Sequence, residues 1–244
     1  MSCIVSSRRC TRAVLQNFGL APFREILKPD AFAGAAEHGS CAPQRQRALI
    51  PEVVAWLMMF VGLQTTSMTQ GLCQTWGVVR VVCPWLTSGC VTEEAFCQAR
   101  RKLTLRFWRR LWGVLQHRFE QRFETHLLWK NTFRLLAIDG CDLNLPNTPA
   151  VVRWFGKPRN GKGLAKRPQA KLVALCSVTT GFCFDFKFIA QRFTEHHALK
   201  HLIRRLKARD LVLMDRGFFP LCRPVGNPVA QGSLSHALVR PTGR

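Results

Sequence analysis

The spacing of hydrophobic residues changes once along the chain, after Asn131. Between residues 44 and 125, apolar residues recur every three or four positions, which is typical of amphipathic helices. After Asn131, short apolar runs and alternating apolar and polar residues predict strands instead. The first 43 residues mix Gly, Ala, Arg and Pro with only weak periodicity. The pattern therefore predicts an irregular segment over 1–43, a helical domain over 44–130 and a mixed α/β domain from 131.

The longest helical pattern starts after Thr92, which is a suitable N-cap residue. Two glutamates follow it, and their charges suit a helix N-terminus. From Phe96 to Phe123 the apolar residues form one continuous stripe. We expect one long amphipathic helix here, with Gly113 as the position of any break.

The second part of the chain reads as strand, hairpin, helix and strand. "FRLLAID" is a short apolar run that ends at Asp139, and "DLVLMD" is another that ends at Asp215. Between them, "KLVALCSV" and "FCFDFKFIA" flank a "TTG" turn and predict a β-hairpin. Four alternating phenylalanines, Phe182 to Phe188, predict a single apolar face for that hairpin. "EHHALKHLIRRLKAR" carries a helical stripe of apolar residues.

Asp139 and Asp215 are the candidates for chemistry. A crossover helix between two strands allows them to pair in parallel, and ligands in α/β sheets bind at the strand ends. If the two strands are neighbours, the two carboxylates meet where the chain leaves the core. Paired carboxylates suit Mg²⁺ or Mn²⁺, which can promote in-line displacement at phosphorus. By itself the pattern is weak evidence, because Asp also ends strands for capping and turn reasons.

The charge of the chain favours a polyanionic partner. The formal net charge is +22 and the pI is about 10.8, so nucleic acid is the first candidate and an anionic membrane surface the second. The longest apolar run, Val53–Leu63, is shorter than the roughly 20 residues that span a bilayer, and no secretory signal is recognisable. We expect no membrane association, and a cytoplasmic, nucleoid-associated protein.

Clustered Lys and Arg residues are the candidates for DNA contact. One set lies on the polar faces of the long helical pattern, where the alternative is an ordinary solvated face. A second set lies in the Gly-rich segment "GKPRNGKG", which does not have the order of a nucleotide-binding P-loop. The predicted DNA-contacting residues are Arg100, Arg101, Lys102, Arg106, Arg109, Arg110, Lys157, Arg159 and Lys162.

Other side chains allow two interpretations each. The 11 cysteines form no C-x-x-C pair, and we interpret most of them as small buried apolar residues rather than disulfides or zinc ligands. His197 and His201 have a zinc-compatible spacing, but we favour a solvated helix face for them. Trp154 and Phe155 are suited either to stacking on an exposed base or, as we favour, to core packing.

Several sequence blocks resemble the catalytic domain of IS4-family transposases. They match in order and at sensible intervals: "AIDGCDLNLPNTP", "WFGKP", "RPQAKLVAL" and "DLVLMDRGFF". Two further blocks, "RQRALIPEVVAWLMMFVGL" and "EEAFCQARRKLTLRFWRRLW", are similar to that family's N-terminal helical region. The resemblance covers roughly residues 22 to 219. It implies a DDE-type enzyme that hydrolyses and rejoins phosphodiesters at element ends with Mg²⁺ or Mn²⁺.

The resemblance also implies a fold and a set of catalytic residues. The fold is α/β, an RNase H-like catalytic core preceded by an all-helical N-terminal domain. Asp139 is similar to the family's first catalytic aspartate, on the first strand, and Asp215 to the second, after the fourth. The family's third acid is a glutamate in a later Tyr/Arg/Glu/Lys motif. This chain contains no Tyr, and no Asp or Glu follows Asp215. The earlier acids Glu195, Asp185, Asp142 and Asp210 are poor substitutes, because they precede the second aspartate.

The sequence therefore predicts an incomplete, C-terminally truncated catalytic domain over 131–220. Residues 221–244, rich in Pro, Gly and Ser, are expected to be a disordered tail unrelated to the family. The principal hypothesis is an inactive or impaired transposase copy that acts on DNA element ends, as a homo-oligomer or paired with intact transposase. The alternatives are a non-catalytic DNA-binding fragment that occupies DNA ends or inhibits intact transposase, and a metal-dependent nuclease that uses only the two aspartates.

Overall fold

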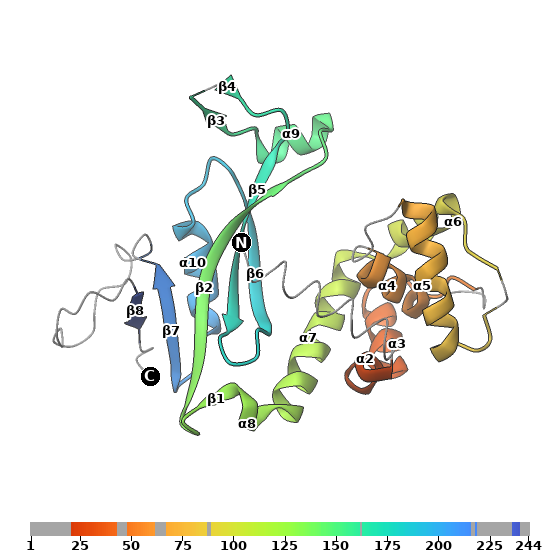
Figure 1. Ribbon diagram of the computed structural model, residues 1–244, viewed down its shortest axis with the longest axis horizontal. Coiled ribbons are helices and arrows are strands. Elements are labelled where there is room, and N and C mark those ends of the chain that lie inside the picture. The colour runs from red at the N-terminus through yellow and green to blue at the C-terminus, as the bar shows by residue number, and fades with distance from the viewer. Residues whose placement is uncertain are drawn as a thin grey trace. The chain divides into compact units, whose positions relative to one another are not determined.

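The computed structural model describes residues 21–42, 48–61, 67–86, 89–161, 163–215, 218 and 236–239. The chain divides into two compact units, Met1–Arg122 and Phe123–Arg244. The first is helical and the second mixes helices with a sheet, so the fold is of the mixed α/β kind (Figure 1). The division falls before Phe123, whereas the sequence led us to expect it after Lys130. In the part of the chain covered here, no helix is long and apolar enough to cross a membrane.

The helical unit packs around a single aromatic and aliphatic core. Its helices are α2 (Ala21–Ile26), α3 (Pro29–His38), α4 (Pro51–Val61), α5 (Met68–Val82), α6 (Glu93–Lys102) and α7 (Leu105–Arg122). Helix α4 is the centre of this core, because Val53 to Leu57 and Phe60 are all buried. The Trp56 ring lies 5.1 Å from Phe32 and 5.8 Å from Phe60. Burial on almost every side explains why the α4 sequence is apolar without a polar stripe.

Helices α2 and α3 lie in a segment for which the sequence predicted no regular structure. The apolar face of α3 is made of Ala31, Phe32, Ala35 and Ala36, all of them buried. Three of these four are alanines, so the face is short and its periodicity is weak in the sequence. Tertiary packing against the core, rather than a strong local pattern, is what stabilises this helix.

The single long helix predicted after Thr92 is wrong, because the chain breaks between α6 and α7. Leu103 has an extended backbone, and Gly113, the expected break, lies inside α7. The Thr104 side chain explains the position of the break: its Oγ1 accepts a hydrogen bond from the backbone N of Phe107 at 3.3 Å. The same hydroxyl donates to the carbonyl oxygen of Gly39 at 3.0 Å. A cap and a tertiary hydrogen bond thus replace one turn of helix.

Gly39 allows the end of α3 to approach the start of α7. A Cβ added at this position would lie 2.9 Å from the Cβ of Phe107 and 3.0 Å from its backbone N. Gly39→Ala is therefore expected to lower the free energy of unfolding of the helical unit by about 1–3 kcal/mol. Thermal unfolding followed by circular dichroism measures it. Gly34→Ala is the matched control, since a Cβ there meets nothing within 4 Å; unchanged stability in Gly39→Ala would refute the close approach.

The second unit is built on one sheet with the order β6-β5-β2-β7-β8. Strands β2 and β7 are parallel, and the pairs β2–β5, β5–β6 and β7–β8 are antiparallel. The predicted hairpin is thus confirmed, and the parallel pairing that the crossover helix allowed is present. The elements are α8 (Glu124–Leu127), β1 (Leu128–Trp129), β2 (Phe133–Asn144), α9 (Pro149–Phe155), β3 (Arg159–Asn160), β4 (Gly163–Leu164), β5 (Gln169–Ser177), β6 (Cys183–Ala190), α10 (His196–Leu202), a 3₁₀ turn (Ile203–Arg205), β7 (Asp210–Asp215) and β8 (His236–Val239).

Helix α10 covers one face of this sheet. It buries Ala198, Leu199 and Leu202 and packs on β5 and β6 (Figure 1). On β6, Asp185 accepts a hydrogen bond from Arg205 Nε at 2.8 Å and lies 3.4 Å from His201 Nε2. The helix-covered face is therefore the face on which Asp185 lies.

The expectation that four phenylalanines share one apolar face of the hairpin is wrong. The register shifts between Leu175 and Cys176, which is the signature of a β-bulge. As a result Phe184 is buried, with the Arg134 guanidinium 4.7 Å above its ring. Phe186 and Phe188, beyond the bulge, are 39% and 48% exposed. One extra residue is enough to change which face a side chain occupies.

Part of the segment predicted as a disordered tail is a strand. Residues His236–Val239 form β8 and pair antiparallel with β7, from Val212↔Val239 to Asp215↔His236. The prediction is thus wrong for these four residues. The reason is that β7 would otherwise expose an unpaired row of backbone donors and acceptors, which a short apolar stretch such as "HALV" can satisfy. Residues 221–235 and 240–244 lie outside the described residues.

Candidate functional site

Asp139 and Asp215 occupy equivalent positions on two neighbouring strands. Ile138 of β2 is the register partner of Met214 of β7, and each aspartate is the next residue on its strand. Because side chains alternate along a strand, both carboxylates point to the same face of the parallel pair. Adjacent strands lie about 4.8 Å apart. Both aspartates are exposed. The register of β2 and β7 thus brings together two predicted site residues that are distant in sequence.

Burial on the opposite face holds the two aspartates in position. Leu136 and Ile138 of β2 and Val212 and Met214 of β7 are buried. Residues directly opposite each other on neighbouring strands lie on the same face of a sheet. Ile138 is opposite Leu175 of β5, and Leu175 is opposite Asp185 of β6, so Ile138 lies on the helix-covered face. The aspartates consequently lie on the other face of the sheet. Asp139 Oδ1 also accepts a hydrogen bond from the backbone N of Gly140 at 2.7 Å.

The face that carries the aspartates is apolar and partly open. Its neighbours around Asp139 are half-buried rather than buried, which leaves room for a ligand to approach the carboxylates. These half-buried neighbours of Asp139 are Leu135, Ala137, Cys141, Leu172, Ala174, Cys176 and Leu213. Among the described residues, no group of three or more His, Cys, Asp or Glu side chains is arranged to hold a metal ion. The site as described therefore offers two carboxylates.

Two carboxylates fit a magnesium-type ion. Mg²⁺ keeps several of its waters and is held by one or two carboxylates together with substrate phosphates, rather than by an all-protein cage. Asp139 and Asp215 supply hard oxygen donors on one exposed sheet face, which meets that requirement. A thiolate-rich or imidazole-rich site, by contrast, would suit zinc or copper. The donor chemistry thus favours Mg²⁺ or Mn²⁺.

The other acids considered from the sequence each have a different environment. Asp210 is buried and ion-paired with Arg134, and Asp185 is ion-paired with Arg205. Asp142 Oδ1 accepts a hydrogen bond from Gln191 Nε2 at 2.9 Å. None of these three lies beside Asp139 and Asp215 on the open face.

The position of Glu195 was not predicted from the sequence. A Cβ at Gly140 would lie only 2.9 Å from Glu195 Oε1, so this carboxylate stands against the residue that follows Asp139. Gly140 directly follows Asp139 on the strand, so the two residues face opposite sides of the sheet. Glu195, which lies against Gly140, is therefore on the helix-covered face rather than with the two aspartates. The absence of a side chain at Gly140 was the sequence signal for this close approach.

Two thiols, Cys141 and Cys176, lie near Asp139, and a third, Cys183, neighbours Cys176. Burial raises the pKa of Cys141, and the neighbouring Asp139 carboxylate raises it further. Cys176 and Cys183 are register partners on β5 and β6. A hydrogen bond from the Cys183 thiol lowers the pKa of Cys176, and the same interaction raises the pKa of Cys183. The surroundings of Asp139 are thus apolar and thiol-rich.

The cysteine prediction needs two corrections. Cys73 and Cys90 are paired as a disulfide, with Cα atoms 5.2 Å apart, although no disulfide was expected. Cys83 is buried as predicted, and burial raises its pKa to about 11. The other described free cysteines are half-buried, because they lie on strands or helices whose faces are only partly covered.

The cations predicted to contact DNA on α6 and α7 are all exposed. No Asp or Glu occurs between Glu94 and Glu120, so this surface has a single sign of charge. Its members, called the α6–α7 cationic patch below, are Arg100, Arg101, Lys102, Arg106, Arg109 and Arg110. Two arginines further along α7 have other partners: Arg118 pairs with Asp30 and Arg122 with Glu25. The Arg118 side chain lowers the pKa of Asp30 by hydrogen bonding.

The predicted contacts in the Gly-rich segment lie on the connection between β2 and β5. Arg159 is exposed and Lys157 is half-buried, whereas Lys162 lies outside the described residues. Trp154 nearby is 70% exposed, so the favoured core-packing interpretation is wrong for this side chain. Helix α9 is short and buries none of its residues, which explains why an aromatic residue there is not buried.

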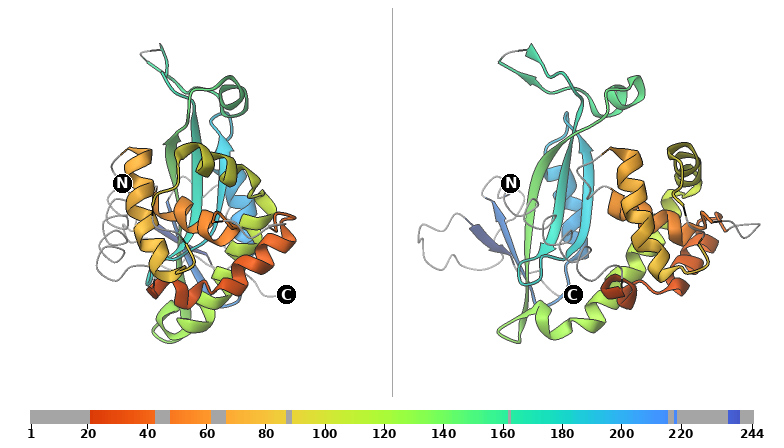
Figure 2. Two further views of the ribbon diagram at one scale, coloured as in Figure 1. Left: turned by 90° about the vertical axis from the view of Figure 1, so that its right-hand side faces the viewer. Right: turned by 45° about the vertical axis from the view of Figure 1, so that its right-hand side comes forward.

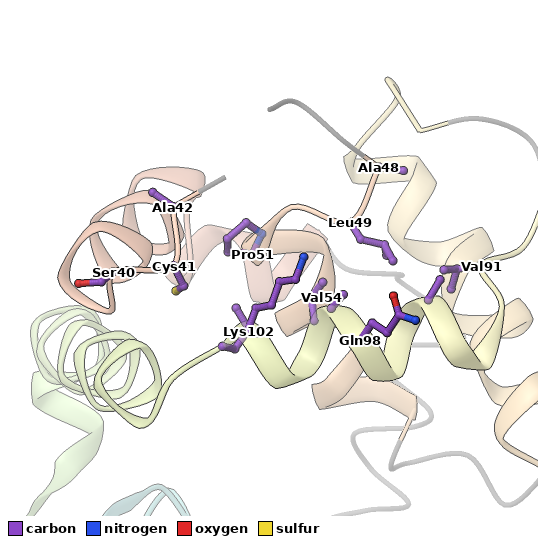
Figure 3. A pocket seen from close by; sticks show the side chains of 13 residues that line it. Ser40, Cys41, Ala42, Ala48, Leu49, Pro51, Val54, Val91, Gln98 and Lys102 are labelled. Carbon is purple, nitrogen blue, oxygen red and sulfur yellow. The ribbon is translucent and has the colours of Figure 1, made fainter. Parts of the chain in front are cut away.

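The helical unit contains a cavity of about 820 Å³, and its described lining residues all belong to that unit. Figure 3 shows apolar side chains such as Leu49, Val54 and Val91 around it, with Gln98 and Lys102 of α6 at one side. The described residues that line it include no Asp, Glu or His. Among the described residues, it therefore offers neither a carboxylate nor an imidazole.

Comparison with known proteins agrees with the family resemblance. The chain is 24% identical over 210 residues to the transposase InsG for insertion sequence element IS4 of Escherichia coli (strain K12). The alignment covers 83% of this chain and 44% of that protein, so the chain spans less than half the length of its relative. No protein-family model and no solved structure matches. The chain is therefore a distant relative of an insertion-sequence transposase.

Proposed function

We propose that this chain is a DDE-type DNA transposase chain that carries the first two acids of the catalytic site, Asp139 and Asp215. The observation that carries the proposal is their position: they are adjacent on parallel strands β2 and β7, on one open sheet face. The distant relationship to a transposase makes phosphodiester cleavage and strand transfer at element ends the best-supported chemistry.

An RNase H-like core is the fold that agrees with this proposal. In such a core the first acid lies on the first strand and the second follows the fourth, as the family resemblance implied. Here β2 is the first long strand of the sheet, the hairpin β5–β6 provides the next two, and α10 leads to β7. The parallel pairing of β2 with β7 supports the same assignment.

The proposed roles follow from the donors. When bound, Mg²⁺ or Mn²⁺ would activate the attacking hydroxyl and stabilise the leaving oxygen. Asp139 and Asp215 would hold the ion from two neighbouring strands, and the half-buried apolar face beside them would limit water around a bound phosphate. The cations on α6–α7 and on the β2–β5 connection hold the DNA backbone.

The activity of these 244 residues by themselves is proposed to be impaired. No Asp or Glu follows Asp215 in the sequence, and the described residues bring no third acid to the Asp139 face. Removing one carboxylate from a site of this kind weakens both metal affinity and its geometry. We propose that the chain acts as a homo-oligomer or paired with an intact transposase, and of these partners only the intact transposase would bring a complete set of acids to the DNA end.

A non-catalytic DNA-binding role is the second candidate, and the α6–α7 cationic patch is the observation that favours it. Six exposed cations on consecutive helices, without an intervening acid, form a surface suited to DNA phosphates. A chain that occupies DNA ends through this surface would block an intact transposase there. This candidate predicts that Asp139→Ala leaves DNA affinity unchanged.

Replacing Arg106, Arg109 and Arg110 together with Ala is expected to weaken duplex DNA binding. Each lost phosphate contact reduces the slope of log affinity against log salt by roughly 0.9. Fluorescence anisotropy with a labelled duplex at several salt concentrations measures the slope. Arg118→Ala is the control, because Arg118 is paired with Asp30 rather than presented to solvent alone. An unchanged slope in the triple variant would show that the patch does not contact DNA.

A further inference from the structure

The connection between β2 and β5, residues 145–168, forms a projecting arm. It leaves the end of β2 after Asn144, builds α9 and the small β3–β4 hairpin, and returns to the sheet at Gln169 (Figure 1). Figure 2 shows α9 and β3–β4 beyond the end of the sheet in both further views. We call residues 145–168 the arm.

The base of the arm is tied to the sheet. Thr148 caps α9 by accepting a hydrogen bond from the backbone N of Val151, and Pro149 occupies the first turn. At the other end of α9, the Phe155 carbonyl accepts a hydrogen bond from the backbone N of Gln191 at 3.1 Å. The Trp154 carbonyl accepts one from Arg192 Nη1 at 3.3 Å. The backbone of Trp154 is thus anchored to the end of β6.

The arm carries one sign of charge. Its sequence contains six Lys and Arg residues and no Asp or Glu: Arg153, Lys157, Arg159, Lys162, Lys166 and Arg167. Four of them, Arg153, Arg159, Lys166 and Arg167, are exposed. Such a segment is suited to a nucleic-acid backbone, and phosphate contacts fix position without reading sequence.

Trp154 adds a second kind of contact. Its side chain is 70% exposed, although its own carbonyl and that of Phe155 accept hydrogen bonds from Arg192 and Gln191. Aromatic side chains beside a cationic groove bind unpaired bases, because every base has a π face that an aromatic ring can cover. In an intact duplex both faces of each base are already stacked on neighbours. An exposed indole among cations therefore favours DNA with an unpaired base.

We infer that Trp154 is a stacking platform for an unpaired base of the DNA substrate, with the arm cations holding the flanking phosphates. This inference rests on the proposed function, and it names the class of substrate: DNA whose end or flank is locally single-stranded. The substrate would therefore not be a uniform duplex.

The geometry of β2 gives the distance between Asp139 and the start of the arm. The strand continues from Asp139 to Asn144, and the arm starts immediately afterwards. Five residues of strand extend about 17 Å, and successive nucleotides along a DNA strand rise about 3.4 Å. The arm that carries Trp154 thus begins about 17 Å along β2 from Asp139, the length of roughly five nucleotides of a DNA strand.

The test compares two DNA molecules of the same sequence, one a blunt duplex and the other carrying a single-stranded extension of about ten nucleotides. Fluorescence anisotropy gives the affinity of the full chain for each. Trp154→Ala is expected to weaken binding of the extended DNA roughly 5- to 150-fold, the range that one base–aromatic stack supplies. Binding of the blunt duplex is expected to stay within about twofold. Trp154→Phe should keep most of the affinity for the extended DNA.

Trp85→Ala is the matched control, because Trp85 is also exposed, at 55%, but lies in the helical unit. It should change neither affinity. Equal losses on both DNA molecules in Trp154→Ala, or no loss on either, would overturn the inference. The proposed function would still be supported in that case if the chain kept its affinity for duplex DNA and its nicking depended on metal. If the unaltered chain binds neither DNA molecule, both the proposed function and the inference fail.

Discussion

Replacing Asp210 with Ala is expected to lower the free energy of unfolding of the α/β unit by about 3–5 kcal/mol, the usual cost of breaking a buried ion pair. The Asp210 and Arg134 side chains are only 2% and 12% exposed. Arg134 donates to both carboxylate oxygens of Asp210, with Nε–Oδ1 and Nη2–Oδ2 distances of 2.7 Å. Without the carboxylate, the guanidinium would be left buried beside Phe184.

The effect should be large because Asp210 also holds the backbone. Its Oδ2 accepts a hydrogen bond from the backbone N of Lys207 at 2.8 Å, and the backbone N of Arg134 donates to the Arg209 carbonyl at 3.0 Å. The pair therefore joins the start of β2 to the turn that leads into β7. A displaced β7 would carry Asp215 out of register with Asp139.

Urea unfolding followed by circular dichroism measures the change. Asp142→Ala is the control, because Asp142 is an exposed acid on the same strand as Arg134 and a surface substitution usually changes stability by less than about 0.5 kcal/mol. The double variant Arg134→Met with Asp210→Leu should recover much of the loss, since apolar replacement of a buried pair is often neutral. A loss below about 1 kcal/mol in Asp210→Ala would contradict the assigned role.

Asp139→Asn and Asp215→Asn are each expected to weaken Mn²⁺ binding at least about 100-fold. The reason is that changing a residue that only orients a metal ligand already costs about 10- to 100-fold. Each change removes one of two donors and leaves the apolar face unaltered. Electron paramagnetic resonance of Mn²⁺ during titration measures the affinity directly. It does so even if this chain by itself cleaves DNA slowly.

Nicking of supercoiled plasmid DNA in Mn²⁺ provides the second readout. Any nicking by the unaltered chain should be lost in Asp139→Asn and in Asp215→Asn. It should be kept in Asp142→Asn, because the native Asp142 carboxylate accepts a hydrogen bond from Gln191 rather than facing the site. Nicking that persists equally in Asp139→Asn and Asp215→Asn would belong to a contaminant or to another site. Equal Mn²⁺ affinity in all variants would remove the two aspartates as metal ligands.

The order of the strands could be predicted because each strand has a local signature. "FRLLAID" and "DLVLMD" are apolar on both faces, and the hairpin strands flank a short turn. The crossover helix α10 between β6 and β7 made parallel neighbours possible. These features depend on residues close together in the sequence, so the expected strand, hairpin, helix and strand agree with β2, β5–β6, α10 and β7.

The failures concern contacts between distant residues. The break before α7 depends on Thr104 meeting Gly39, which is 65 positions away. The position of Phe184 depends on a bulge and on Arg134, a residue of a different strand. The exposure of Trp154 depends on how α9 is tied to the end of β6. None of these contacts leaves a periodic signal in the local sequence.

The sequence by itself determined that Asp139 and Asp215 each follow a buried apolar run, because strand burial on both faces leaves a continuous hydrophobic pattern that ends where the chain meets solvent. It also determined the excess of positive charge, which is a property of composition alone. Only the tertiary structure decided that the two carboxylates share one face and one level of the sheet. That register is set by the pairing of β2 with β7, whose ion-paired residues Arg134 and Asp210 are 76 positions apart in the sequence. A shift of one residue between these strands would turn one carboxylate to the opposite face.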